Sequence, residues 1–154
     1  MATFEKINDF VEHVCEGAHA LQSDNLRLAL SATNPTAETS NPKSDGNGLL
    51  ANVTQIAYTN FASDPTSRDI TVNASGQTGG TYSLSLTDLT LTASGGAIAA
   101  FEWIYVFNEG TAVLTDPLIG LYDYGSALTL NDGESLTIDF GANGAGAGNL
   151  FTLT

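Results

Sequence analysis

The sequence predicts a mainly β protein, an antiparallel β-sandwich with jelly-roll-like connectivity, preceded by one N-terminal amphipathic helix. Three observations predict this class. Apolar and polar residues alternate in several segments from residue 26 onward, and clusters of turn residues separate these segments. Only the N-terminal segment repeats with the period of a helix. Residues 100–107 are apolar on both faces, which is typical of a strand that is covered on both sides.

The N-terminal segment has apolar residues three and four positions apart, which is the spacing of one helix face. We therefore expect a helix over residues 3–21, within an N-terminal helical arm of residues 1–25. This helix could pack on the sheet of its own chain or act as an arm on another subunit. The apolar positions of the stripe are Phe4, Ile7, Val11, Val14, Ala18 and Leu21.

A single β-sandwich domain of seven or eight strands is expected over residues 26–154, because this length can bury a real core. Residues 26–32 alternate and form its first strand. Residues 33–48 are a long loop of turn residues, and loops of this length in compact domains are usually functional or mobile. Two short strands are expected next, at residues 55–58 and 70–74.

A long strand is expected over residues 81–93, but the parity of its apolar positions changes near Thr87 and Asp88. Such a change marks a β-bulge or a strand that crosses between two sheets. The residues of the first parity are Tyr82, Leu84 and Leu86, and those of the second are Leu89, Leu91 and Ala93.

The strand at residues 100–107 carries aromatic residues on one face and Ile104 with Val106 on the other. One face belongs to the domain core. The other could be covered by a second element of the same chain or by a neighbouring subunit. The aromatic residues are Phe101, Trp103, Tyr105 and Phe107.

The C-terminal part predicts further strands at residues 118–124, 127–130, 135–140 and 150–153. The turn sequence at residues 131–134 has Asp-Gly at its centre and is expected to join the second and third of these as a hairpin. A glycine-rich connector is expected at residues 141–148.

The chain is strongly acidic, with 17 Asp and Glu against 4 Lys and Arg and a net charge of −13. Such a chain should repel nucleic acid and anionic lipid, so we expect neither partner. No signal peptide and no apolar run of spanning length is visible, so the protein is expected to be synthesised in a cytoplasm and to be soluble there. The single cysteine, Cys15, is expected to be a small buried apolar residue.

Residue patterns for catalysis or metal binding are weak, and we expect no enzyme activity, no cofactor and no bound metal. No nucleophile motif is present, and paired carboxylates for a hydrolase have no support from composition, although any two of the seventeen acidic residues could meet. Two groups of residues rich in carboxylates are candidate ion sites. A solvated helix face explains the first and a plain turn explains the second. They are Glu12 and Glu16 with His19, and Asp132 and Glu134 with Asp139.

Several segments are distinctive in combination: residues 4–12, 21–30, 82–96, 116–125 and 131–140. Together they resemble a family of small virion proteins of tailed bacteriophages. The resemblance covers most of residues 4–32 and 81–154, and leaves residues 33–80 unmatched. It implies a non-enzymatic structural protein of the virion, and a capsid decoration (cement) protein that binds the outer head shell and stabilises it. The implied partners are the major capsid protein and copies of the chain, with a trimer favoured.

The residues expected at such interfaces are apolar or aromatic, because these types dominate binding energy at protein interfaces. An alternative function is a β-sandwich binding module of a tail fibre or baseplate, with a glycan or a protein as receptor. Aromatic side chains could then stack on sugars. The expected interface residues are Phe4, Ile7, Val11, Val14, Phe101, Trp103, Tyr105, Tyr122 and Tyr124.

Overall fold

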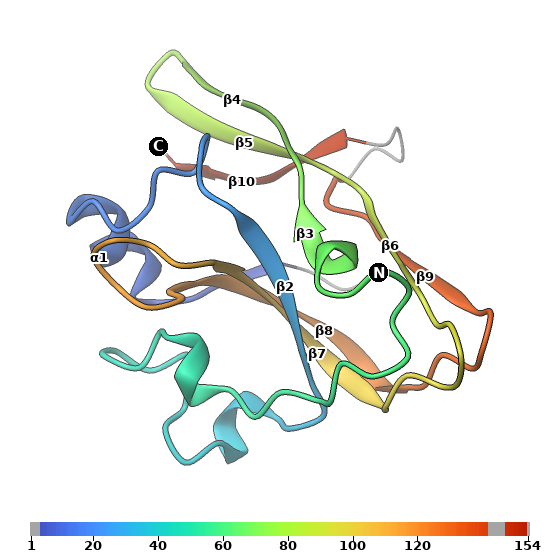
Figure 1. Cartoon of the computed structure of the whole chain (residues 1–154). Helices are drawn as coiled ribbons and strands as arrows, with labels where there is room; N and C mark the ends of the chain where they lie inside the picture. Colours follow the sequence, from blue (N-terminus) through green and yellow to red (C-terminus); the bar gives the residue numbers. More distant parts are fainter. Residues whose placement is uncertain (1–3, 142–146, 154) are drawn as a thin grey trace.

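The computed structural model describes residues 4–141 and 147–153, and it is mainly β, with antiparallel sheets (Figure 1). Within the described residues, ten strands form three sheets. The five-stranded sheet has the order β1 (Phe4–Lys6), β8 (Leu118–Leu128), β7 (Phe101–Asn108), β2 (Leu26–Ser31) and β3 (Asp69–Ile70). The three-stranded sheet has the order β10 (Ala147–Leu153), β5 (Thr81–Thr87) and β4 (Val72–Thr78), and the two-stranded sheet pairs β6 (Leu89–Thr92) with β9 (Ser135–Ile138).

Helical structure is short in the described part of the chain. There is one α-helix, α1 (Phe10–Cys15), and there are three single-turn 3₁₀ helices. The latter are η1 (Pro35–Ala37), η2 (Leu50–Asn52) and η3 (Thr66–Arg68). No helix among these residues combines the length and the apolar character that crossing a lipid bilayer requires.

The helix predicted over residues 3–21 is wrong in its extent. Residues Phe4–Lys6 form β1, which pairs antiparallel with β8 at the edge of the five-stranded sheet. The α-helix ends at Cys15 because Gly17 adopts a φ of +76°, where the chain closes a Schellman motif. In this motif the amide of Ala18 donates to the carbonyl of His13 (2.8 Å), and Gly17 donates to Val14 (3.2 Å).

The apolar stripe of the N-terminal segment also does not form one buried face. Ile7 and Phe10 are fully buried and belong to the main core, whereas Val11 in the same stripe is 47 % exposed. The N-terminal residues therefore contribute to the core of the β-sheets instead of forming a continuous amphipathic helix.

The change of parity within residues 81–93 is confirmed as a crossing between two sheets. β5 lies in the three-stranded sheet, and β6, which follows directly, lies in the two-stranded sheet (Figure 1). The side chains of Leu84, Leu86 and Leu91 are fully buried, so both parts of this segment face the same core.

The strand that is apolar on both faces is confirmed as β7, which lies inside the five-stranded sheet between β8 and β2. Ile104 lies opposite Leu30 and Tyr122 on one face, and Tyr105 lies opposite Ala29 and Leu121 on the other. All its residues except Glu102 are buried.

Both covers of the five-stranded sheet come from the same chain. The other two sheets contribute to the core on the face of Ile104. Residues 33–58, here named the covering loop, lie on the other side of the five-stranded sheet, in cyan to green in Figure 1. Leu50 and Val53 of this loop belong to the buried core. The Ser31 hydroxyl of β2 donates to the carbonyl of Thr54 (2.6 Å).

The covering loop also forms hydrogen bonds with the backbone of β2 along the part of its edge that the short strand β3 does not reach. The amide of Ile56 donates to the carbonyl of Leu30 (2.9 Å), and the amide of Leu30 donates to the hydroxyl of Tyr58 (2.9 Å). Residues 55–58 were predicted as a strand, and this is wrong, because they make this contact without strand pairing. Arg68 completes the edge by donating to the carbonyl of Leu28 (2.9 Å).

The carboxylate of Asp9 fixes the middle of the covering loop. It accepts hydrogen bonds from the amides of Gly46 (2.9 Å) and Gly48 (2.8 Å). The amide of Leu118 in turn donates to the carbonyl of Gly48 (2.9 Å). Asp9 is only 5 % exposed, so this clamp connects the N-terminal segment, the loop and β8 in a dry setting.

The turn at residues 131–134 is confirmed, with Gly133 at a φ of +83° and the Glu134 amide donating to the carbonyl of Asn131 (2.9 Å). The hairpin predicted around this turn is wrong. β9 pairs with β6, while β8 continues to Leu128. Most of the glycine-rich connector predicted at residues 141–148 lies outside the described residues, and the strand predicted at 150–153 is part of β10.

Candidate functional site

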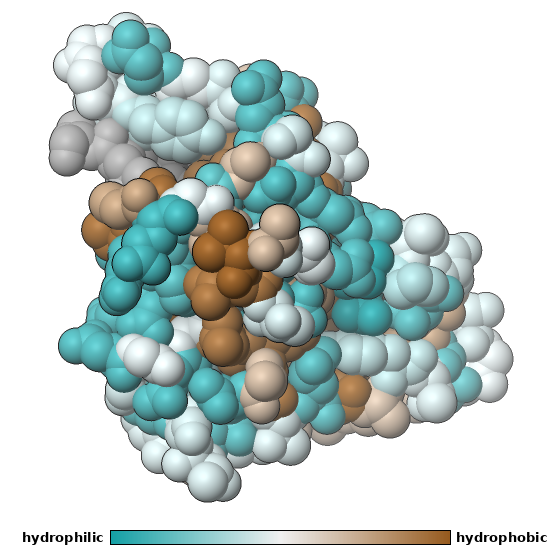
Figure 2. Space-filling model, turned by 60° about the vertical axis from the view of Figure 1, so that its left-hand side comes forward, coloured by the Kyte–Doolittle hydropathy of each residue, from teal (hydrophilic) through white to brown (hydrophobic). Residues whose placement is uncertain are grey.

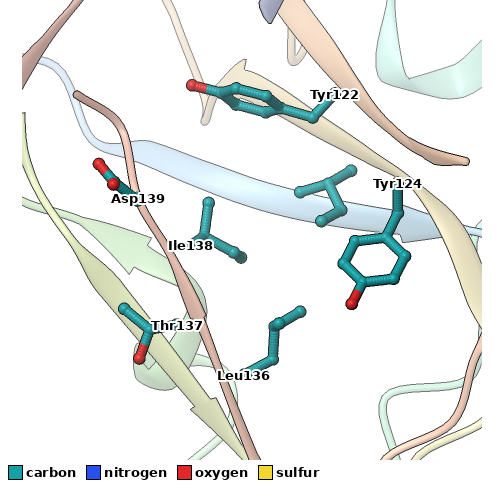
Figure 3. Close-up of a pocket in the computed structure, with 7 residues that line it drawn as sticks. Tyr122, Tyr124, Leu136, Thr137, Ile138 and Asp139 are labelled. Atoms are coloured by element: carbon teal, nitrogen blue, oxygen red, sulfur yellow. The ribbon is translucent and has the colours of Figure 1, made fainter. Parts of the chain in front are cut away.

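A hollow that carries predicted interface residues lies between the five-stranded sheet and β9. We name it the tyrosine cleft. Tyr122 and Tyr124 of β8 point into it from one side, and β9 lies on the other side (Figure 3). Its volume is about 160 Å³. The lining residues are Ile104, Tyr122, Tyr124, Leu136, Thr137, Ile138 and Asp139.

Strand geometry places each of these side chains. Tyr122 and Tyr124 are two positions apart on β8 and so share a face, and Ile104 of β7 lies directly opposite Tyr122. β9 approaches this face because it pairs with β6, which the chain reaches by crossing from the three-stranded sheet. Leu136 and Ile138, two positions apart on β9, supply the apolar wall on that side.

The two tyrosines differ in environment. Tyr122 is 7 % exposed, and its ring lies against Phe4 (centroids 5.4 Å apart) and Phe140 (6.3 Å). Burial raises the pKa of Tyr122, and the carboxylates of Asp139 and Asp88 raise it further, so its hydroxyl stays protonated. Tyr124 is 45 % exposed and forms the outer margin of the cleft.

The composition of the cleft is suited to binding. Its floor is aliphatic, its rim offers tyrosine hydroxyls and a carboxylate, and it contains no histidine, serine or cysteine. Its volume is below the range of about 300–1,000 Å³ that drug-sized ligands occupy, so it has room for one side chain or a small ring. Tyrosine in a partly desolvated pocket is among the residues that contribute most to binding.

The structure brings only Tyr122 and Tyr124 of the predicted interface residues into this cleft. Trp103, which was expected to act with them, has its register partners on the opposite face, beside Tyr105, and is 9 % exposed. Three others are fully buried in the core, and Phe4 packs on Tyr122. The fully buried residues are Ile7, Phe101 and Tyr105.

The residues on β9 and Ile104 were not identified from the sequence as part of a site. The alternation over 135–140 predicted which of them point inward. The pairing of β9 with β6, which brings them to Tyr124, joins residues far apart in the sequence and leaves no local signal.

A second apolar area lies on the face that carries α1, and Figure 2 shows it surrounded by hydrophilic atoms. Val11 of α1 is 47 % exposed. A hollow of about 340 Å³ beside α1 is lined by Val14, His19, Leu21 and Tyr82. Val11 and Val14 are therefore predicted interface residues of the N-terminal segment that reach the surface beside α1.

A buried polar cluster closes the end of β7 below this area. The side-chain amide of Asn108 donates to Asp24 and to Nδ1 of His19 (3.1 Å to the latter). Burial, together with the nearby His13, lowers the pKa of His19 to about 4, against the opposing effect of Asp24. Because His19 is neutral at pH 7, the cluster holds the chain together without an ion pair at this histidine.

Replacing His19 with glutamine should reduce the acid sensitivity of the fold. The unfolded chain, with an ordinary histidine pKa near 6.5, binds the proton first as the pH falls. The contribution of neutral His19 is therefore complete above pH 6.5 and lost as the pH falls toward 4. After allowance for partial exposure this amounts to about 2 kcal/mol. Urea unfolding measures the free energy of unfolding at pH 7 and at pH 4. Its decrease between the two pH values should be smaller by this amount in His19→Gln than in the unaltered chain. Equal decreases would contradict the role of His19 in acid sensitivity.

The acidic residues of the second candidate ion site accept hydrogen bonds from backbone amides. Asp132 accepts from the amide of Gly95 (2.8 Å), Glu134 from Asn131 (2.7 Å), and Asp139 from Gly141 (2.8 Å). Across residues 4–141 and 147–153, no group of three or more His, Cys, Asp or Glu is arranged to hold a metal ion. The expectation for Cys15 is wrong, because the thiol lies at the exposed end of α1 and not in the core.

Comparison with known proteins gives no relative for this chain. No protein-family model matches it, and no curated protein and no solved structure matches it significantly.

Proposed function

We propose that the chain is a non-enzymatic structural protein of a bacteriophage virion, a capsid decoration protein that binds the outer head shell and stabilises it. The resemblance of most of residues 4–32 and 81–154 to small virion proteins supports the proposal that the chain is part of a virion. The tyrosine cleft supports a role in binding another protein. A jelly-roll-like β-sandwich belongs to the same proposal, as the finer description of the antiparallel sheets.

The observation that carries the proposal is the size and chemistry of the cleft. A hollow of about 160 Å³ with an aliphatic floor and two tyrosines takes one apolar side chain, which is how a protein surface anchors on another. We propose that the side chain comes from the major capsid protein. The carboxylate that lines the cleft, Asp139, favours a partner surface with basic or neutral residues around that anchor.

Replacing Tyr124 with alanine should weaken binding to heads by about 10- to 100-fold, since interface tyrosines of this kind contribute roughly 1–3 kcal/mol. The fold should survive, because this ring is 45 % exposed. The measurement is co-sedimentation with heads assembled from the major capsid protein of the same genome.

Val113→Ala is the matched control, because Val113 is an exposed apolar residue (57 %) that does not line the cleft. It should bind as the unaltered chain does. Equal binding by Tyr124→Ala would show that the cleft is not the docking site, and a chain that does not bind heads at all would contradict the decoration role.

The second candidate is a binding module of a tail fibre or baseplate. The specific observation in its favour is the pair of tyrosines beside Asp139, because aromatic rings with neighbouring hydrogen-bonding groups can hold a sugar ring. A glycan array separates the two candidates: binding that is lost in Tyr124→Ala, together with no binding to heads, would favour the tail module.

A further inference from the structure

The three-stranded sheet carries no charged residue, in a chain with a net charge of −13. No Asp, Glu, Lys or Arg occurs between Asp69 and Asp88, which includes β4 and β5, and none follows Asp139, which includes β10. Seventeen acidic residues are thus distributed over the remainder of the chain. Like charges at close range oppose association. Because the strands of this sheet carry no carboxylates, two copies can approach each other here without that repulsion.

β4 is the outer strand of this sheet and lies at the margin of the molecule (Figure 1). Among the described residues its only strand neighbour is β5, so its other edge presents backbone donors and acceptors without a strand partner. It is seven residues long, and most of them are exposed. A sheet edge of this kind is a template for pairing with another strand.

The two edges of the five-stranded sheet, β1 and β3, are protected in ways that β4 is not. β1 has three residues and carries Glu5 and Lys6, and β3 has two residues, of which Asp69 forms an ion pair with Arg27 (2.6 Å). Natural proteins block edges by shortening them and placing charges on them. β4 is long and uncharged, so its edge has neither of these protections and is open to pairing.

The outer face beside this edge is also open to close approach. Its side chains are small and leave a shallow hollow of about 260 Å³, lined by Ala74, Ser75, Gly76, Thr78, Ser83 and Ser85. The opposite face is apolar and turned inward, with Leu84 and Leu86 fully buried. A second sheet of the same composition can thus lie alongside without a steric or electrostatic obstacle.

We propose that the β4 edge is a self-association surface, at which β4 pairs antiparallel with β4 of a second copy of this chain. Pairing of one strand with its own copy is two-fold symmetric and closes after two subunits. It joins two three-stranded sheets into one continuous sheet. The proposal goes beyond head binding and does not depend on it. It gives a dimer, where the resemblance to virion proteins implies a trimer.

Ala74→Asp tests the proposal, because it places a charge near the middle of β4, close to its symmetry mate. Light scattering of the full chain should give twice the chain mass of 16.0 kDa, and Ala74→Asp should give the monomer mass, with dimerisation weakened at least about tenfold. Ala127→Asp is the matched control, because Ala127 is an exposed alanine of β8 outside this sheet, and it should remain dimeric.

Mixing Ala74→Asp with Ala74→Lys excludes misfolding as the cause. Opposite charges at the paired edges should restore a dimer from two monomeric variants, which a misfolded variant cannot do. A monomeric or trimeric unaltered chain, or loss of the dimer in Ala127→Asp as well as in Ala74→Asp, would overturn the proposal. None of these measurements uses heads, so their failure is separate from failure of the decoration role.

Discussion

Replacing Asp9 with alanine should lower the free energy of unfolding by about 3 kcal/mol and release the covering loop. The carboxylate accepts two backbone amides, and the Gly48 amide is buried, so the variant leaves that donor without a partner. Hydrogen bonds to a charged group contribute roughly 1.5–3 kcal/mol, and an unsatisfied buried donor costs a similar amount. Urea denaturation followed by Trp103 fluorescence measures the change, since Trp103 lies on the face that the loop covers.

Asp45→Ala is the control for this effect, because Asp45 is an exposed carboxylate of the same loop with one hydrogen bond, from the side chain of Asn8 (3.2 Å). It should change stability by no more than about 0.5 kcal/mol. If Asp9→Ala is as stable as Asp45→Ala, the clamp does not hold the loop.

Gly120→Ala should detach β1 and cost about 3 kcal/mol. A Cβ at this position would lie 2.2 Å from the ring of Phe4 and 2.7 Å from the backbone oxygen of Glu5. The ring could rotate, but the backbone oxygen belongs to the strand paired with β8, so β1 must move. Overpacking of this kind costs roughly 1–3 kcal/mol, and loss of the Phe4 contact with Tyr122 adds to it.

Gly76→Ala is the matched control, because a Cβ there meets no atom within 4 Å and its φ is ordinary. It should leave the stability of the monomer unchanged or slightly raised. Calorimetry of the two variants makes the comparison. Equal transition temperatures would contradict the close packing of β1 on β8.

Features that depend on one strand and its faces could be predicted from the sequence. The period of two in a strand predicted three features that the structure confirms. They are the first strand, the alternation of apolar and polar residues in β5, and the two apolar faces of β7. The parity change near Thr87 predicted either a β-bulge or a crossing between sheets, because only a local break in phase is needed to detect it, and the structure shows the crossing.

The N-terminal prediction failed because three-and-four spacing is compatible with more than one structure. Phe4 lies on an edge strand, Ile7 fills the core after that strand, and Phe10 does so from a short helix, so three apolar residues reach the core from different elements. Long-range pairing with β8 decided the outcome, and tertiary contacts of this kind override local propensity.

The candidate site could be predicted only in part. Tyr122 and Tyr124 were expected at an interface, and they share a cleft. Trp103 was grouped with them by residue type, but the pleat of the sheet places it on the other face. Residues 33–48 of the covering loop have no strand or helix pattern, and the role of the loop depends on the clamp by Asp9, a contact between residues more than thirty positions apart.

The chain closes both faces of its own five-stranded sheet, and we propose the tyrosine cleft and the β4 edge as its recognition surfaces. Amide hydrogen exchange at a concentration where the chain is monomeric tests it directly. The amides of Gly48, Leu50 and Ile56 should exchange slowly, because they donate to Asp9, Asp116 and Leu30. Exchange at these three positions as fast as in the exposed turn at Gly79 would contradict the account, since the second face would then need a partner to cover it.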